Sequence, residues 1–184
     1  MRIVAGRFRG KALLSPRDDS IRPTADRVRE AIFNILASRL GPNFDGLRVL
    51  DLFAGTGALG LEALSRGARS VVFVDDGVEA RGLIRDHIEV FGAAGVTKLL
   101  RRDATNLGPA GTMGPCDLIF LDPPYGKGLG ERALLSARAG NWFARDATIV
   151  LEEATAVPLD LPPGFTLEDR REYGAAAIHF ISQS

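Results

Sequence analysis

The sequence predicts an α/β protein with a doubly wound, mostly parallel sheet, an antiparallel C-terminal hairpin and a small N-terminal β-hairpin arm. From residue 48 to residue 152, short apolar runs alternate with helix-length segments, as in sheets whose parallel strands are joined by helices. The last part breaks this alternation, because residues 165–173 and 175–181 are both strand-like and are separated by little more than Gly174. Strands joined this tightly run antiparallel.

Hydrophobic periodicity places the individual elements. The expected parallel strands are residues 48–53, 70–75, 97–101, 117–121 and 147–152. The expected helices between them are residues 58–64, 78–91 and a segment within 130–139.

A further helix is predicted ahead of the first parallel strand, starting at residues 23–24. Thr24 can accept hydrogen bonds from the first-turn amides, and Asp26 lies near the positive end of the helix dipole. The apolar residues at helical spacing should form its buried face: Val28, Ala31, Ile32, Ile35 and Leu36. Arg27, Glu30 and Asn34 form a polar stripe, which is either simply solvated or lies beside a ligand crevice.

Composition is that of one ordinary globular domain with a small appendage. The chain has 184 residues, of which 46% are hydrophobic and 25% are charged. Its longest apolar runs have the length of a strand, so we expect neither a membrane span nor a signal peptide, and a cytoplasmic location. No feature of the sequence indicates an obligate dimer, and we expect a monomer.

Charge is distributed unevenly along the chain. On this basis we divide the chain into a basic arm, residues 1–22, and a main domain, residues 23–184. The net charge is zero, but residues 1–30 contain eight Arg or Lys and four Asp or Glu, which leaves 15 basic and 19 acidic residues for the rest. Such an arm suits a polyanionic partner, although a solvated pair of surface strands has the same pattern. The candidate nucleic-acid-binding residues are Arg2, Arg7, Arg9, Lys11, Arg22 and Arg27.

The glycine turn after the first parallel strand is the predicted ligand site. Gly55 and Gly57 can adopt backbone dihedrals that are closed to other residues and let a ligand approach the backbone closely. The free amides of the following helix start face that ligand, and Asp51 lies at the carboxyl end of the strand. Phe53 and Ala54 complete the expected binding turn. Residues 55–60 also read as G-x-G-x-x-G, a pattern that is weak by itself.

Acids end the next two strands. Asp75 lies about twenty residues beyond the glycine turn, where a carboxylate accepts ribose hydroxyls in nucleotide-binding sheets, and Asp76 is the competing candidate. Asp103 and Ala104 close the third strand, where an acid and neighbouring backbone can bind an adenine.

A second reactive segment, Asp122-Pro123-Pro124-Tyr125, ends the fourth strand. The two prolines fix the backbone and remove its donors, which leaves acceptors beside an aromatic ring. Asp122 and the Pro123 carbonyl can accept from a planar amino group, while Tyr125 can stack on the ring that bears it. We therefore predict that these four residues carry the catalysis. Cys116, His87 and His179 have no ligand-spaced neighbours, so we interpret them as structural and expect no metal site.

The segment Asp51-Leu-Phe-Ala-Gly-Thr-Gly resembles motif I of the class I S-adenosylmethionine-dependent methyltransferases, which have a Rossmann-like fold. Residues 2–11, Arg22-Pro-Thr-Ala-Asp-Arg-Val-Arg-Glu-Ala-Ile-Phe-Asn34 and Asp122-Pro-Pro-Tyr125 are similar to the RsmD-like family of 16S ribosomal RNA guanine-N2 methyltransferases. The resemblance covers nearly the whole chain. It implies S-adenosylmethionine as the methyl donor, and as the acceptor a guanine N2 of 16S rRNA in an assembled or assembling small subunit.

Three other functions remain open. DNA adenine-N6 methyltransferases also use Asp-Pro-Pro-Tyr for a flipped base, but they generally need an added target-recognition region that these 184 residues lack. Protein-glutamine methyltransferases typically have Asn where Asp122 lies. A non-catalytic RNA-binding assembly factor could use the same fold as a scaffold.

Overall fold

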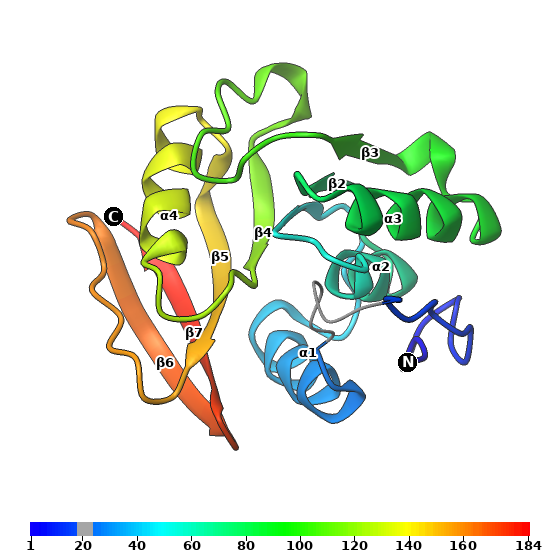
Figure 1. Cartoon of the computed structure of the whole chain (residues 1–184), viewed down its shortest axis with the longest axis horizontal. Coiled ribbons are helices and arrows are strands. Elements are labelled where there is room, and N and C mark those ends of the chain that lie inside the picture. The colour runs from blue at the N-terminus through cyan, green and yellow to red at the C-terminus, as the bar shows by residue number, and fades with distance from the viewer. Residues whose placement is uncertain (18–23) are drawn as a thin grey trace.

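A computed structural model of the chain describes residues 1–17 and 24–184 (Figure 1). The helices are α1 (Asp26–Leu40), α2 (Ala58–Ser65), α3 (Val78–Val90) and α4 (Leu129–Ala139), with short 3-10 turns at Ala94–Val96 and Gly111–Met113. The strands are β1 (Arg48–Leu52), β2 (Ser70–Val74), β3 (Thr97–Leu100), β4 (Cys116–Leu121), β5 (Phe143–Ala154), β6 (Phe165–Tyr173) and β7 (Ala176–Gln183). The predicted α/β class and order of elements are confirmed.

The seven strands form one sheet in the order β3-β2-β1-β4-β5-β7-β6. Strands β1 to β5 are parallel to one another, whereas β7 runs antiparallel to both of its neighbours, β5 and β6. The order reverses between β1 and β4, so the loops after these two strands diverge and leave a crevice at the carboxyl edge. In Figure 1 the β6–β7 hairpin forms one side of the molecule and α3 the opposite side.

Both faces of the central strands are buried, which explains their continuously apolar sequences. Leu118 and Phe120 of β4 contact one core cluster, to which α1, α2 and α3 contribute. Ile119 and Leu121, the alternate residues, contact a second cluster formed with α4 and Trp142. This two-residue alternation is the geometry of a strand between two helical layers.

The largest boundary error concerns β5, which extends beyond the predicted residues 147–152 in both directions. Its first residue, Phe143, pairs with Cys116 across a register shift, and its last, Ala154, pairs with Ala176 of the hairpin. Strands β4 and β7 supply the hydrogen bonds that extend β5, so the apolar run in the sequence does not mark where β5 begins and ends. The other predicted strands and helices agree to within two residues.

Thr24 does not cap α1, contrary to the prediction. The N-cap is Ala25 and makes no side-chain hydrogen bond. The predicted buried face is correct at Val28, Ile32 and Leu36, but it also contains Phe33 and the charged residue Arg29, which is completely buried. The stripe of Arg27, Glu30 and Asn34 is solvent-exposed and does not line the crevice.

The N-terminal segment folds back on itself, but it forms one isolated antiparallel bridge, Arg2 to Ala12, rather than a regular strand pair. Ile3 and Leu13 are buried in the core beside α1 and α2. The Glu62 carboxylate of α2 accepts hydrogen bonds from the amides of Val4 and Ala5, and it also pairs with Arg29 at 3.4 Å. The segment is therefore fixed to the domain by backbone hydrogen bonds to a buried carboxylate, which hydrophobic periodicity does not predict. Among the described residues, no helix is long and apolar enough to cross a membrane.

Candidate active site

A cavity of about 660 Å³ opens at the carboxyl edge of the sheet, at the point where the strand order reverses. This volume is within the range of small-molecule sites, about 300–1,000 Å³. The sequence-predicted residues that line it are Asp51, Phe53, Ala54, Gly55, Asp75, Asp76, Asp103, Ala104, Asp122, Pro123, Pro124 and Tyr125. The fold thus brings the two predicted segments, the glycine turn and the Asp122–Tyr125 loop, into one site.

The glycine turn owes its shape to positive φ angles. Phe53 has φ 54°, an unusual value for a residue with a side chain, and Gly55 and Gly57 have φ 60° and 80°. Gly57 does not line the cavity but acts as the N-cap of α2. A Cβ at Gly60 would lie 2.5 Å from the Phe73 ring and 3.0 Å from the Asp51 carboxylate, so this glycine lets α2 pack against the sheet.

Asp51 is the most deeply buried acid of the site, with 1% of its surface exposed. Its Oδ2 accepts the amide of Gly60 at 3.0 Å. Burial disfavours the ionised form and, together with the nearby Asp75 and against the effect of the Gly60 amide, raises the pKa of Asp51 to about 8. The protein without ligand thus holds a neutral carboxyl group there at pH 7. A cation in the cavity would favour its ionisation.

Asp75 joins the glycine turn to the loop after β2. One carboxylate oxygen accepts from Gly55 at 2.9 Å and the other from Gly77 at 2.8 Å. Burial raises the pKa of Asp75, and these two amides oppose that shift. Asp76 is exposed on the cavity wall, so both candidates for ribose binding lie at the site.

At the end of β3, Asp103 accepts from the Thr105 amide at 2.8 Å and the Thr105 hydroxyl at 2.7 Å. These hydrogen bonds lower the pKa of Asp103, and the one from the Thr105 hydroxyl has the larger effect. Asp103 is therefore an anion at neutral pH. Ala104 beside it is buried and contributes apolar wall.

Side chains from distant elements hold the Asp122–Tyr125 loop. The Tyr125 hydroxyl donates to Glu152 at 2.7 Å, and Glu153 accepts the amide of Gly126 at 3.0 Å. Both glutamates are buried near the end of β5. On the other side of the loop, the Thr24 hydroxyl donates to Asp122 at 3.1 Å. Sequence reasoning missed these three partners, because no local pattern connects them to the loop.

The cavity lining is strongly acidic. Its acidic members are Asp51, Asp75, Asp76, Glu79, Asp103 and Asp122. Of the described lining residues, Arg102 is the one basic side chain. Such a lining favours a ligand that carries positive charge.

His87, which was predicted to be structural, lies beneath the glycine turn. Its Nδ1 lies 2.9 Å from the Thr56 carbonyl, and its Nε2 accepts from the Leu14 amide at 2.8 Å, so Nδ1 is the protonated nitrogen. Burial lowers the pKa of His87, and the Thr56 carbonyl opposes that effect.

Cys116 and His179 are also buried, and burial raises the pKa of Cys116 to about 12 and lowers that of His179. Among the described residues no acidic, His and Cys side chains are grouped so that they could hold a metal ion.

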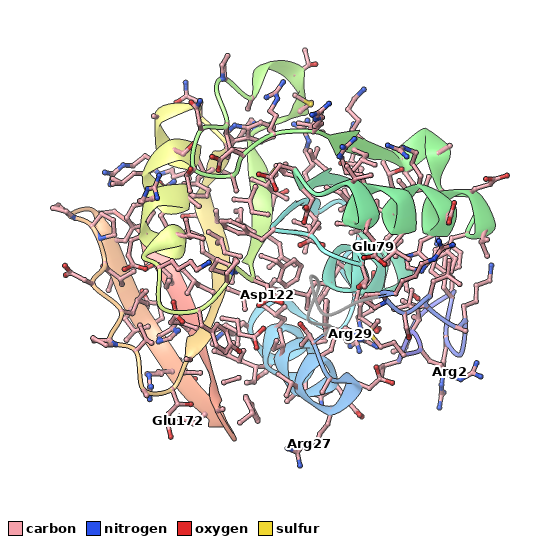
Figure 2. The ribbon with its side chains drawn as sticks, viewed as in Figure 1. Arg2, Arg27, Arg29, Glu79, Asp122 and Glu172 are labelled. Carbon is pink, nitrogen blue, oxygen red and sulfur yellow. The ribbon has the colours of Figure 1, made fainter. Side chains whose placement is uncertain are left out.

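The five candidate nucleic-acid-binding residues that the structure describes do not line the cavity. The four of the arm, Arg2, Arg7, Arg9 and Lys11, are exposed. The arm instead contacts the carboxyl end of α2, where Arg7 donates its amide to the Ser65 carbonyl. In Figure 2, Arg2 and Arg27 project into solvent, whereas Asp122 lies near the centre of the molecule. Arg22 is outside the described residues.

The Asp122–Tyr125 loop after β4, which presents hydrogen-bond acceptors to the cavity, is called the acceptor loop below. A doubly wound sheet with a glycine turn after β1 and such a loop after β4 has the architecture of the class I methyltransferases. The solved structure named "Putative methyltransferase yhhF from Escherichia coli" is similar to this chain with a TM-score of 0.82 and 31% identity, covering 100% of this chain and 97% of that one. The fold class predicted from the sequence is thereby confirmed.

The family described as "Conserved hypothetical protein 95" matches residues 1–182. "Ribosomal RNA small subunit methyltransferase D" of Escherichia coli (strain K12) is 35% identical over 186 residues, which cover 100% of this chain and 90% of that protein. The "tRNA (guanine(6)-N2)-methyltransferase" of Thermus thermophilus is 33% identical over 159 residues, covering 78% of this chain and 46% of that protein. The chain belongs to the RsmD-like family.

Proposed function

We propose that this protein transfers a methyl group from S-adenosylmethionine to the exocyclic N2 of a guanine in 16S rRNA. The observation that carries the proposal is that Asp122, followed by two prolines and Tyr125, lies on the wall of the cavity formed by the glycine turn. An acceptor loop for an amino group and a turn for a nucleoside-like ligand thus meet in one site.

The cavity fits S-adenosylmethionine, whose sulfonium and ammonium groups are cationic. The acidic lining complements these charges, and the open backbone of residues 53–55 allows close approach. Asp75 or Asp76 accepts the ribose hydroxyls, since each carboxylate oxygen has a second lone pair. Asp103 and the Ala104 backbone bind the adenine. When bound, the cofactor supplies an electrophilic methyl group.

The acceptor loop prepares the nitrogen that attacks. The amino group of guanine is a poor nucleophile, because its lone pair is delocalised into the ring. Asp122 and the Pro123 carbonyl accept its hydrogens and favour a pyramidal nitrogen, while Tyr125 stacks on the base. With the cofactor bound, this nitrogen would form the new N–C bond as the C–S bond breaks and sulfur keeps the bonding electron pair; the extra proton on nitrogen would then pass to solvent water. Positioning and electrostatic complementarity supply most of the acceleration.

Two relatives support an RNA substrate, since their names specify methylation of small-subunit rRNA and of a guanine N2 in tRNA. The exposed cations of the arm supply contacts to phosphates. The arm is attached at Ser65, where the Arg7 amide donates to the Ser65 carbonyl, and Ser65 lies about 10 Å along α2 from the cavity end of that helix at 1.5 Å per helical residue. The bound RNA therefore extends along the α2 side of the domain. We propose that the protein acts as a cytoplasmic monomer on an assembled or assembling subunit.

Transfer of tritiated methyl from S-adenosylmethionine tests the function. Small subunits, naked 16S rRNA and duplex DNA are incubated in parallel, and the labelled nucleoside is identified by mass spectrometry. We expect N2-methylguanosine in small-subunit RNA. Label on adenine N6 of DNA would establish the rival enzyme, and tight RNA binding without any transfer would establish a non-catalytic assembly factor.

Salt dependence tests the role of the arm. Each phosphate contact contributes roughly one unit to the slope of log affinity against log salt. Replacing Arg2, Arg7, Arg9 and Lys11 together with Ala should flatten that slope, whereas Lys98→Ala, at an exposed cation on β3, should leave it unchanged. An unaltered slope in the folded fourfold variant would mean that the arm is only a solvated surface.

A further inference from the structure

Thr24 lies on the cavity wall and donates its hydroxyl hydrogen to Oδ2 of Asp122, at 3.1 Å. The two residues are 98 positions apart in the chain. A Thr just before a helix ordinarily accepts a hydrogen bond from a first-turn amide. Here α1 begins at Asp26 without such a bond, so the hydroxyl group contacts the acceptor loop instead of the helix end.

The direction of the Asp122 carboxylate oxygens depends on hydrogen bonds of this kind, because the backbone does not fix it. The terminal torsion of an Asp side chain is broad and roughly two-fold, so hydrogen bonds set the rotation of the group. The loop beyond Asp122 has anchors of its own in Glu152 and Glu153, which hold Tyr125 and Gly126. These contacts act three and four residues further along and do not orient the Asp122 side chain.

We propose that Thr24 is a positioning residue for methyl transfer, whose hydroxyl contributes to setting the rotation of the Asp122 carboxylate and so to aiming its acceptor oxygen at the amino group of the substrate base. Thr24 acts through Asp122 and does not touch the reacting atoms. The inference rests on the proposed function of Asp122. It means that the part of the chain preceding α1, outside the parallel sheet, contributes to catalysis as well as to RNA binding.

Single-turnover methylation, with RNA and S-adenosylmethionine both saturating, is the test. Thr24→Val removes the hydroxyl and preserves the shape of the side chain, and it should slow transfer roughly ten- to a hundredfold, as expected for a lost hydrogen bond to a charged group. The dissociation constants of cofactor and RNA should not change. Thr24→Ser keeps the hydroxyl and should restore most of the rate.

A matched control is Thr97→Val. This substitution also deletes a Thr hydroxyl that donates a hydrogen bond, of 2.9 Å to the Ala93 carbonyl, but at the opposite end of β3 from the cavity. It should methylate at the wild-type rate. A loss as large as that of Thr24→Val would show that removing a Thr hydroxyl slows this protein without acting through Asp122, and would overturn the inference.

A double-mutant cycle separates positioning from a general structural effect. In an Asp122→Ala background, Thr24→Val should cause no further loss, because its target is gone. A full additional loss there, or wild-type rate in the single Thr24→Val variant, would overturn the inference while leaving the proposed function intact. If the wild-type protein labels a base other than guanine in rRNA, the proposed function fails, and the same cycle is measured on the labelled base. If it labels no acceptor, both fail.

Discussion

The glycine turn after β1 and the acceptor loop after β4 line the same cavity but are held in different ways. The turn is held on the β2–α3 side of the cavity: Asp75 accepts the Gly55 amide at 2.9 Å, and His87 Nδ1 lies 2.9 Å from the Thr56 carbonyl. Within the turn, the Gly57 amide donates to the Ala54 carbonyl at 2.8 Å. The acceptor loop is fixed by side chains from distant elements, 98 positions away for Thr24 and 27 for Glu152.

This difference separates two functions within one site. A turn held from β2 and α3 does not depend on the contacts of the loop opposite, so the proposed cofactor binding should depend on residues of the β1, β2 and α3 side. A loop oriented by remote side chains can lose its alignment while the cofactor pocket remains formed. Substitutions in the turn should therefore affect cofactor affinity, and those in or behind the loop should affect the rate of transfer.

The largest expected effect is that of Gly57→Val in the turn. Gly57 has φ 80°, which a β-branched residue adopts only with strain, and its Cβ would lie 3.2 Å from the Phe73 ring and 3.3 Å from Ile84. S-adenosylmethionine binding, measured by calorimetry, should be abolished. Gly82→Ala is the control, since a Cβ there meets nothing within 4 Å. Unchanged cofactor affinity in folded Gly57→Val would refute the role of the turn.

Next in size is Asp122→Ala in the loop. Loss of an oriented acceptor in the transition state typically costs about 2.7–4 kcal/mol, roughly a hundred- to a thousandfold in rate. Single-turnover methylation should fall by this factor, with cofactor affinity preserved. Asp122→Asn keeps one acceptor oxygen and should be faster than Asp122→Ala. Full activity of folded Asp122→Ala would mean that another acceptor in the loop, and not Asp122, holds the amino group.

A smaller effect should follow from Tyr125→Phe, which keeps the aromatic ring and deletes the hydrogen bond to Glu152. Removing one partner of a buried pair costs about 1–3 kcal/mol. We expect a rate about tenfold lower, a loss near the lower end of that range. Glu152→Gln retains an acceptor for the tyrosine hydroxyl and should be milder. If Tyr125→Phe instead weakened cofactor binding at an unchanged rate, the separation between turn and loop would be wrong.

The last prediction concerns stability rather than catalysis, through Asp51 and pH. Its pKa rises from 3.8 to about 8 on folding, so between these values the folded protein holds a proton that the unfolded chain has released. Stability therefore falls as pH rises through this window, by up to about 2 kcal/mol between pH 6 and pH 8. Asp51→Asn carries no such proton, and its melting temperature should fall less over the same range. Parallel melting curves of the two proteins would contradict the raised pKa.

Much of the fold could be predicted from the sequence because its signals are contiguous. Apolar runs, their spacing and the glycine turn identified the parallel strands, and the short connection at Gly174 identified the hairpin. The two segments that line the cavity were also predictable, since loops after neighbouring parallel strands meet at one edge.

The tertiary structure alone decided which side chains hold those segments. Thr24 has the sequence signature of a helix cap, yet its hydroxyl contacts Asp122. Arg29 has the appearance of a surface residue on α1, yet it is buried against Glu62. Local sequence records periodicity and turn chemistry, whereas a hydrogen bond between residues far apart exists only after the chain has brought them together. For that reason the segments that line the cavity were predictable, and their hydrogen-bond partners from distant elements were not.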